Sequence, residues 1–202
     1  MKNTVKSALA LLLFAAGTSG LFAGAVLSTG PIALGVNDEG ELNYSGGSIT
    51  TTNGSGGALG IAIQNPTGGG YVDATAPGCL CEGWGVSASG VGGGADLSEG
   101  GIDNITVNSF TSSATNIVST TSLTSMPNLV VTQNYSVAVA GALFKDHVTI
   151  TNSSGSTMTD VSYVRVMDWD IPPTEFSEIV TVKGTGTTSD LVYSNDNGFM
   201  IL

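Results

Sequence analysis

Positive charge is scarce in this sequence. Five Lys and Arg residues and one histidine stand against sixteen Asp and Glu residues, giving a net charge of −11 at pH 7. Nucleic-acid binders need clustered Lys and Arg to replace the counterions of phosphates, so this composition excludes that class. Charged residues make up only 10% of the chain, which is untypical of coiled coils and helical bundles.

Long apolar runs are also missing beyond the N-terminus. Residues 1–25 are typical of a signal peptide, with two lysines, nine apolar residues at 8–16 and an Ala-Gly-Ala cleavage motif at 23–25. The run is interrupted before it reaches the roughly 20 residues of a spanning helix. We expect cleavage after Ala25 and a secreted or cell-surface chain, 26–202, with no membrane span. An uncleaved membrane anchor is the alternative interpretation.

Cleavage there would leave three basic residues against sixteen acidic ones, a net charge of −13. Such a charge favours solubility and repels polyanions, and it attracts divalent cations. The mature chain has the length of a single domain.

What the sequence has in abundance is small and β-favouring residues: 29 glycines, 23 serines and 24 threonines. Hydrophobic residues make up 41% of the chain, enough to form a core, which argues against disorder. Segments rich in Val, Ile, Thr and aromatics predict strands. These segments are 32–36, 60–63, 102–110, 115–121, 128–132, 135–143, 147–152, 161–171, 179–183 and 191–193.

The sequence also predicts how some of these strands are arranged. We expect 147–152 and 161–171 to pair as a hairpin, with the second strand ending at Pro172, and we expect Gly92–Gly94 to form a loop. Short strands separated by turn signals, without helical periodicity, favour an all-β fold, an antiparallel β-sandwich preceded by the signal peptide.

The acidic pair Asp168 and Asp170 is the most specific candidate site. On a regular strand both carboxylates share one face, with Trp169 on the other, and Glu175 follows nearby. Calcium, which takes six to eight oxygen ligands, is the candidate cofactor that would relieve their repulsion. Three alternatives stay open: neutralisation by Arg165, acid–base chemistry on a sugar, and a structural role in which one Asp caps a turn.

Other ionisable residues point to no catalytic chemistry. The segment 37–41 (Asn-Asp-Glu-Gly-Glu) is expected to be a solvated turn, and His147 a solvent-facing residue on a strand. The chain has no G-x-S-x-G nucleophile motif. We therefore expect a protein that is not an enzyme.

Cys79 and Cys81 are the only cysteines, and an exported compartment permits a disulfide between them. Residues two apart on an extended strand lie near the bridging limit, but the flanking Pro77-Gly78 and Gly83 make a closer turn. Such a bond would rigidify a local loop beside Trp84. Metal binding by these two thiols and a distant histidine is less favoured.

Several segments of the sequence are similar to segments of a known group of proteins. They are residues 32–43 (IALGVNDEGELN), 73–85 (DATAPGCLCEGWG), 165–178 (RVMDWDIPPTEFSE) and 191–199 (LVYSNDNGF). They resemble secreted bacterial proteins that often end in a PEP-CTERM sorting tail, which an exosortase processes. The resemblance implies association with the cell surface and the extracellular polymer matrix, and it implies no enzymatic activity. The sequence stops after the apolar residues 199–202 without such a tail, so we expect the natural gene to continue.

These observations together predict a non-enzymatic exported protein of the cell surface or extracellular matrix. Its expected partners are extracellular polysaccharide or other surface components. The alternative is a carbohydrate-binding or carbohydrate-processing sandwich module in which Trp169 or Trp84 stacks on a sugar ring. A buried Trp169 would favour the scaffold, and an exposed one beside both carboxylates would favour sugar binding.

Overall fold

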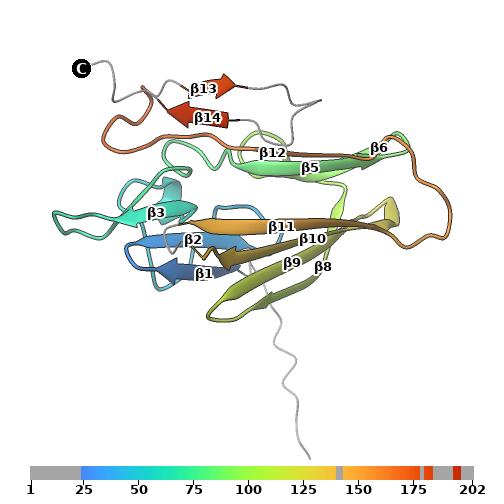
Figure 1. The fold of residues 1–202 in the computed structure, drawn as a ribbon, viewed down its shortest axis with the longest axis horizontal. Coiled ribbons are helices and arrows are strands. Elements are labelled where there is room, and N and C mark those ends of the chain that lie inside the picture. The colour runs from blue at the N-terminus through green and yellow to red at the C-terminus, as the bar shows by residue number, and fades with distance from the viewer. Residues whose placement is uncertain (1–23, 140–142, 178–179, 184–192, 197–202) are drawn as a thin grey trace, which may run out of the picture.

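A computed structural model describes residues 24–139, 143–177, 180–183 and 193–196 of the chain (Figure 1). Its strands form three four-stranded sheets and one two-stranded sheet, and all strand pairs are antiparallel. Within the described residues the one helical element is a 3-10 turn, η1 (Ser55–Gly57), and no helix there is long and apolar enough to cross a bilayer. The predicted all-β class is confirmed.

The first sheet, called here the N-terminal sheet, has the order β1-β2-β3-β4. Its strands are β1 (Gly24–Thr29), β2 (Ile32–Asn37), β3 (Ile61–Gln64) and β4 (Tyr71–Asp73). β1 begins at Gly24 and places Leu27 in the core at 1% exposure. The cleavage point expected after Ala25 therefore falls inside this strand.

The second sheet, called here the platform sheet, has the order β11-β10-β9-β8. Its strands are β8 (Ile105–Ser112), β9 (Asn116–Leu123), β10 (Met126–Val137) and β11 (Phe144–Asn152). The two strands expected at 128–132 and 135–143 are one strand, β10, which ends at Val137. β10 continues through the polar Gln133 because this side chain is buried and hydrogen-bonded inside the protein.

The third sheet, called here the glycine-rich sheet, has the order β12-β5-β6-β7. Its strands are β5 (Gly83–Ala88), β6 (Val91–Asp96), β7 (Gly101–Asp103) and β12 (Ser162–Val166). A separate hairpin joins β13 (Val180–Lys183) to β14 (Tyr193–Asp196). The apolar end at 199–202 lies outside the described residues.

The hairpin expected between 147–152 and 161–171 is wrong. β11 pairs with β10, whereas β12 pairs with β5 in the other sheet. Val148 and Ile150 of β11 and Tyr163 of β12 pack against one core cluster, so the two strands contribute to that cluster from different sheets. β12 also ends at Val166, several residues before the prolines that were expected to end it.

The loop expected at Gly92–Gly94 is wrong too, because these residues lie within β6. Gly94 pairs with Gly85 of β5, and a Cβ atom at Gly94 would collide with the backbone of Trp84. Glycine here allows two strands to approach closely rather than marking a turn.

The platform sheet faces the two other sheets across the hydrophobic core. Trp84 and Val86 of the glycine-rich sheet pack with Leu123 and Val131 of the platform. The N-terminal sheet packs against another part of the same face, where its buried side chains meet platform residues. The members of this second cluster are Leu27, Leu34, Val36, Leu42, Ile117 and Tyr135. The result is a sandwich whose platform sheet packs against the two other sheets (Figure 1).

Candidate functional site

The guanidinium of Arg165, whose side chain is 17% exposed, lies where the three sheets meet. Its Nε is 2.6 Å from Glu82 Oε1, and its Nη1 is 3.3 Å from Asp146 Oδ2. Nη1 also donates to the hydroxyl of Tyr135 at 2.6 Å, and Nη2 donates to the carbonyl of Gly40 at 3.1 Å. Arg165 comes from β12, Tyr135 and Asp146 from the platform, Glu82 from just before β5, and Gly40 from the segment after β2.

Gln133 completes this cluster as a shared acceptor. Its Oε1 accepts hydrogen bonds from Arg165 Nη1 at 2.5 Å, from Tyr135 OH at 2.9 Å and from Tyr163 OH at 3.2 Å. The guanidinium carbon also lies 5.5 Å from the ring centroid of Tyr135, within cation–π range. The cation is thus surrounded by groups that fix its position, which suits a structural brace.

The segment Asn37–Asn43, called here the junction loop, contains the turn expected at 37–41, but the expected solvation is wrong: Asp38 and Glu39 are half-buried and the other residues are buried. Asn37, Glu41 and Asn43 are 3%, 0% and 5% exposed. The loop backbone is tied to the glycine-rich sheet, because Leu42 N donates to Glu82 Oε2 at 2.5 Å and the Trp84 indole donates to the Glu39 carbonyl at 2.9 Å. Sequence reasoning missed this because acidic residues beside Gly usually face water.

Burial shifts the pKa values of several carboxyl groups upward. Desolvation, together with a hydrogen bond to Asp38, raises the pKa of Glu39 to about 7. Desolvation also raises the pKa values of Glu41 and Glu82, although hydrogen bonds to Glu41 and the Arg165 charge beside Glu82 oppose the rise. Asp73 and Asp146 are shifted in the same direction for the same reason.

The structure separates the three acids proposed to hold calcium. Asp168 is exposed and lies 3.4 Å from the Cys79 sulfur. Asp170 is 6% exposed and accepts a hydrogen bond from Phe176 N at 3.3 Å. Glu175 accepts from Asn53 Nδ2 at 3.4 Å. The side chains take different partners, and calcium binding stays a prediction.

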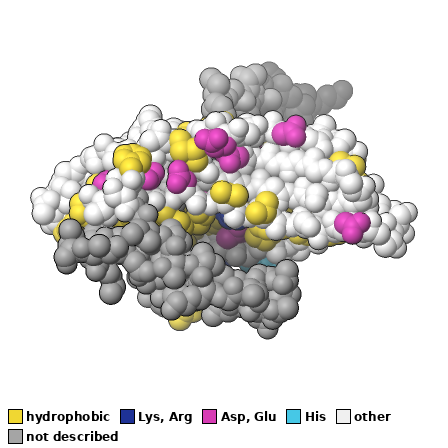
Figure 2. All heavy atoms as spheres, turned by 90° about the horizontal axis from the view of Figure 1, so that it is seen from above, with side chains coloured by type: hydrophobic (Ala, Val, Ile, Leu, Met, Phe, Trp, Pro, Cys, Tyr) yellow, Lys and Arg dark blue, Asp and Glu magenta, His cyan; other side chains and the backbone are white. Residues whose placement is uncertain are grey.

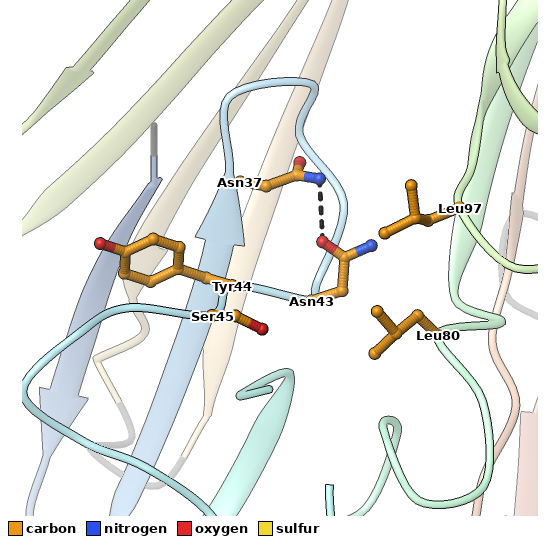
Figure 3. Close-up of a pocket in the computed structure, with 6 residues that line it drawn as sticks. All are labelled: Asn37, Asn43, Tyr44, Ser45, Leu80 and Leu97. Carbon is orange, nitrogen blue, oxygen red and sulfur yellow. Dashed lines mark hydrogen bonds between the residues drawn. The ribbon is translucent and has the colours of Figure 1, made fainter. Parts of the chain in front are cut away.

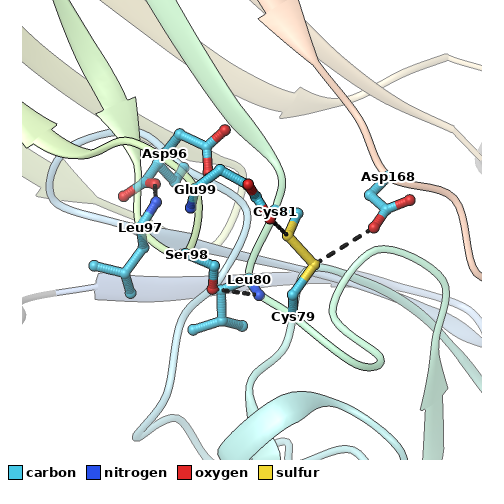
Figure 4. The surroundings of a disulfide bond; sticks show 9 residues. Cys79, Leu80, Cys81, Asp96, Leu97, Ser98, Glu99 and Asp168 are labelled. Carbon is cyan, nitrogen blue, oxygen red and sulfur yellow. Dashed lines mark hydrogen bonds between the residues drawn. A yellow bond between two sulfur atoms is a disulfide. The ribbon is translucent and has the colours of Figure 1, made fainter.

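Cys79 and Cys81 are joined by a disulfide with their Cα atoms 5.3 Å apart, as the sequence favoured (Figure 4). Glu99 Oε1 lies 3.5 Å from the Cys81 sulfur. Within the described residues, the two sulfurs and Asp168 are the one group close enough together to hold a metal ion. Metal ligation requires thiolates, so the oxidised pair supplies no metal centre.

The two tryptophans occupy different environments. Trp84 is 3% exposed and stacks on Tyr163, with ring centroids 6.1 Å apart, so it belongs to the core and cannot take a sugar. Trp169 is half-buried, which matches neither of the two outcomes expected for it. His147 is exposed on β11, as predicted.

A surface cleft of about 220 Å³ opens beside the junction loop (Figure 3). Its lining consists of Asn37, Asn43, Tyr44, Ser45, Leu80 and Leu97. The cleft mixes two leucine side chains with amide and hydroxyl groups, a composition suited to binding a small uncharged group. Nothing in the sequence marked it, because its walls come from three separate segments.

Comparison with known proteins found no relative of this chain. No family model, no curated protein and no solved structure matches the chain.

Replacing Arg165 tests the brace. Arg165→Met should lower the free energy of unfolding by about 3–5 kcal/mol, because it leaves the fully buried Glu82 without its cation. Adding Glu82→Gln should restore part of this loss. Urea unfolding followed by circular dichroism measures both. Lys145→Met, at an exposed position, is the control and should change stability by less than about 0.5 kcal/mol. A loss below about 1 kcal/mol for Arg165→Met would contradict the brace.

The raised pKa values predict that the fold loses stability as pH rises. Glu39 has a pKa of about 7 in the folded protein, against 4.5 for an ordinary glutamate, so the folded state holds its proton more tightly. Stability from this group is present below about pH 4.5 and declines as pH rises through 7. After allowing for solvent access, the decline should be about 1–2 kcal/mol. Thermal melts between pH 4.5 and 8 measure it.

Glu39→Gln should flatten this pH dependence, because it removes the titrating group. Glu99→Gln, at an exposed position, is the matched control and should keep the wild-type slope. Equal slopes for wild type and Glu39→Gln would show that the Glu39 proton does not couple to folding.

Proposed function

We propose that this chain is a non-enzymatic exported protein of the cell surface or extracellular matrix. It contacts acidic polysaccharide through the outer face of the platform sheet. The observation that carries the proposal is the charge of this face. Asp146 is the one carboxylate on its four strands, and it points inward to Arg165.

The outer face is instead rich in hydroxyl and amide groups. Strand pairing places Thr149, Thr132 and Thr120 side by side on three neighbouring strands. Adjacent strands lie about 4.8 Å apart, so these side chains form a regular row. The hydroxyls of Thr120 and Thr132 lie 3.4 Å apart. A flat row of hydroxyls suits contact with a hydroxyl-bearing polymer.

One positive charge, that of Lys145, adds to this row, and His147 adds an imidazole. Lys145 and His147 are both exposed on β11, with Ser136 and Asn134 opposite them on β10. Figure 2 views the other side of the molecule, above β12, β5 and β6, where Asp and Glu side chains lie among small apolar patches. Because the Debye length is about 8 Å at physiological salt, a ligand responds to the local face rather than to the net charge.

The interior supports a non-catalytic role. The buried carboxylates with raised pKa values take structural partners: Glu82 and Asp146 pair with Arg165, Glu41 accepts from Leu97 N, and Asp73 accepts from Gly60 N. The signal-like N-terminus and the resemblance to PEP-CTERM proteins favour export.

Binding of the full chain to insoluble polysaccharide tests the proposal. In co-sedimentation we expect binding to cross-linked alginate, which is carboxylated, and weaker binding to cellulose, which is neutral. Raising NaCl from 0.05 to 0.5 M should weaken the alginate binding because the contact with Lys145 is screened. Thr132→Glu should reduce the bound fraction at least about ten-fold, since it places an anion at the centre of the face.

The matched control is Ser162→Glu, which puts the same charge on the exposed edge strand β12 of the other sheet. It should bind as the wild type does. Equal losses in both variants, or equal binding to alginate and cellulose, would refute recognition by the platform face.

A further inference from the structure

The side-chain amide of Asn43 is buried with an unused donor. Asn43 is 5% exposed, and its Nδ2 has no hydrogen-bond partner within the described residues. Leaving a buried N–H unpaired costs about 1–3 kcal/mol. An unpaired donor that lines a cleft indicates a missing acceptor.

Its neighbours fix which way this amide faces. The backbone N–H of Glu41 donates to Asn37 Oδ1 at 2.8 Å, which orients the Asn37 amide. The Asn37 nitrogen then donates to Glu41 Oε2 at 2.7 Å and to Asn43 Oδ1 at 2.8 Å. Because the oxygen of Asn43 must face this donor, its nitrogen faces the opposite way, toward Leu97 (Figure 3).

The apolar walls of the cleft are held in place. Leu97 N donates to Glu41 Oε1 at 2.8 Å, which ties this wall to the junction loop. Leu80 lies between the bonded cysteines, and its N–H donates to Ser98 Oγ at 2.9 Å (Figure 4). The Leu97 side chain is 36% exposed and lies beside the buried Asn43 nitrogen (Figure 3), so a ligand reaches this nitrogen only when Leu97 rotates away.

The donor and the walls together define a ligand class. An amide N–H group binds a hydrogen-bond acceptor, and two leucine side chains favour a small apolar group next to that acceptor. The acidic Glu41 behind Asn43 disfavours an anion. We propose that the cleft binds a neutral N-acyl group. Its carbonyl oxygen accepts from Asn43 Nδ2, and its methyl lies between Leu80 and Leu97.

This chemistry occurs in N-acetylated amino sugars and in acetylated peptides. The proposal is independent of the platform face, which lies on other strands and is tested with a different polymer. Thr132→Glu should leave cleft binding unchanged, so failure of either proposal is visible separately.

Nuclear magnetic resonance of the full, isotope-labelled chain tests the cleft. The probes are the N-acetylglucosamine disaccharide, an acetyl-lysine peptide, the glucose disaccharide and the unacetylated peptide. We expect saturable shifts of the Asn43 side-chain amide and of the Leu80 and Leu97 methyls with the acetylated probes only. The tighter of the two acetylated probes identifies the source of the group.

Substitutions test whether the cleft is a binding site or only a water-filled depression. Leu97→Lys changes an exposed side chain and should weaken binding at least about ten-fold, whereas Val164→Lys, on the outer face of β12, should not. Asn43→Asp keeps the shape but removes the donor, and it should abolish the shifts. The proposal is overturned if no acetylated probe shifts these signals, if the unacetylated probes shift them equally, or if Leu97→Lys binds as well as the wild type.

Discussion

The pairing of Arg165 with Glu82 is the interaction on which the sandwich depends. A fully buried carboxylate is unfavourable unless a cation and hydrogen bonds satisfy it, and Glu82 has both, from Arg165 Nε and Leu42 N. The same guanidinium reaches the platform through Asp146 and Tyr135. One side chain therefore links strands that are far apart in sequence, and the position of each sheet depends on it.

This arrangement explains where acidic residues are tolerated. The junction loop lies where three sheets meet, so its acids are desolvated and their pKa values rise. Hydrogen bonds from Asn37 and from Leu97 N offset part of this cost for Glu41, and protonation offsets more of it at low pH. With Asp146 turned inward, the outer face of the platform is left free of carboxylates.

Sequence reasoning succeeded where one physical rule acted alone. The alternation of β11 and the branched residues of β2 and β9 predicted strands, because side chains on a pleated surface alternate. It failed where partners decided the outcome. β6 needs glycine only because β5 approaches closely, β12 pairs with a strand almost 80 residues earlier, and Glu41 is buried by groups from other sheets. Local patterns contain no information about such partners.

The cleft follows from the same constraint. Since Glu41 is buried, its hydrogen-bond partners must come from within the protein. Asn37 therefore bonds to Glu41 with both its side-chain nitrogen and its side-chain oxygen. This arrangement directs the oxygen of Asn43 toward Asn37 and leaves its nitrogen facing Leu97 (Figure 3). A buried donor that faces Leu97 is thus a consequence of holding the loop together. The orientation of the Asn43 amide is therefore fixed, because changing it would break the network around Glu41.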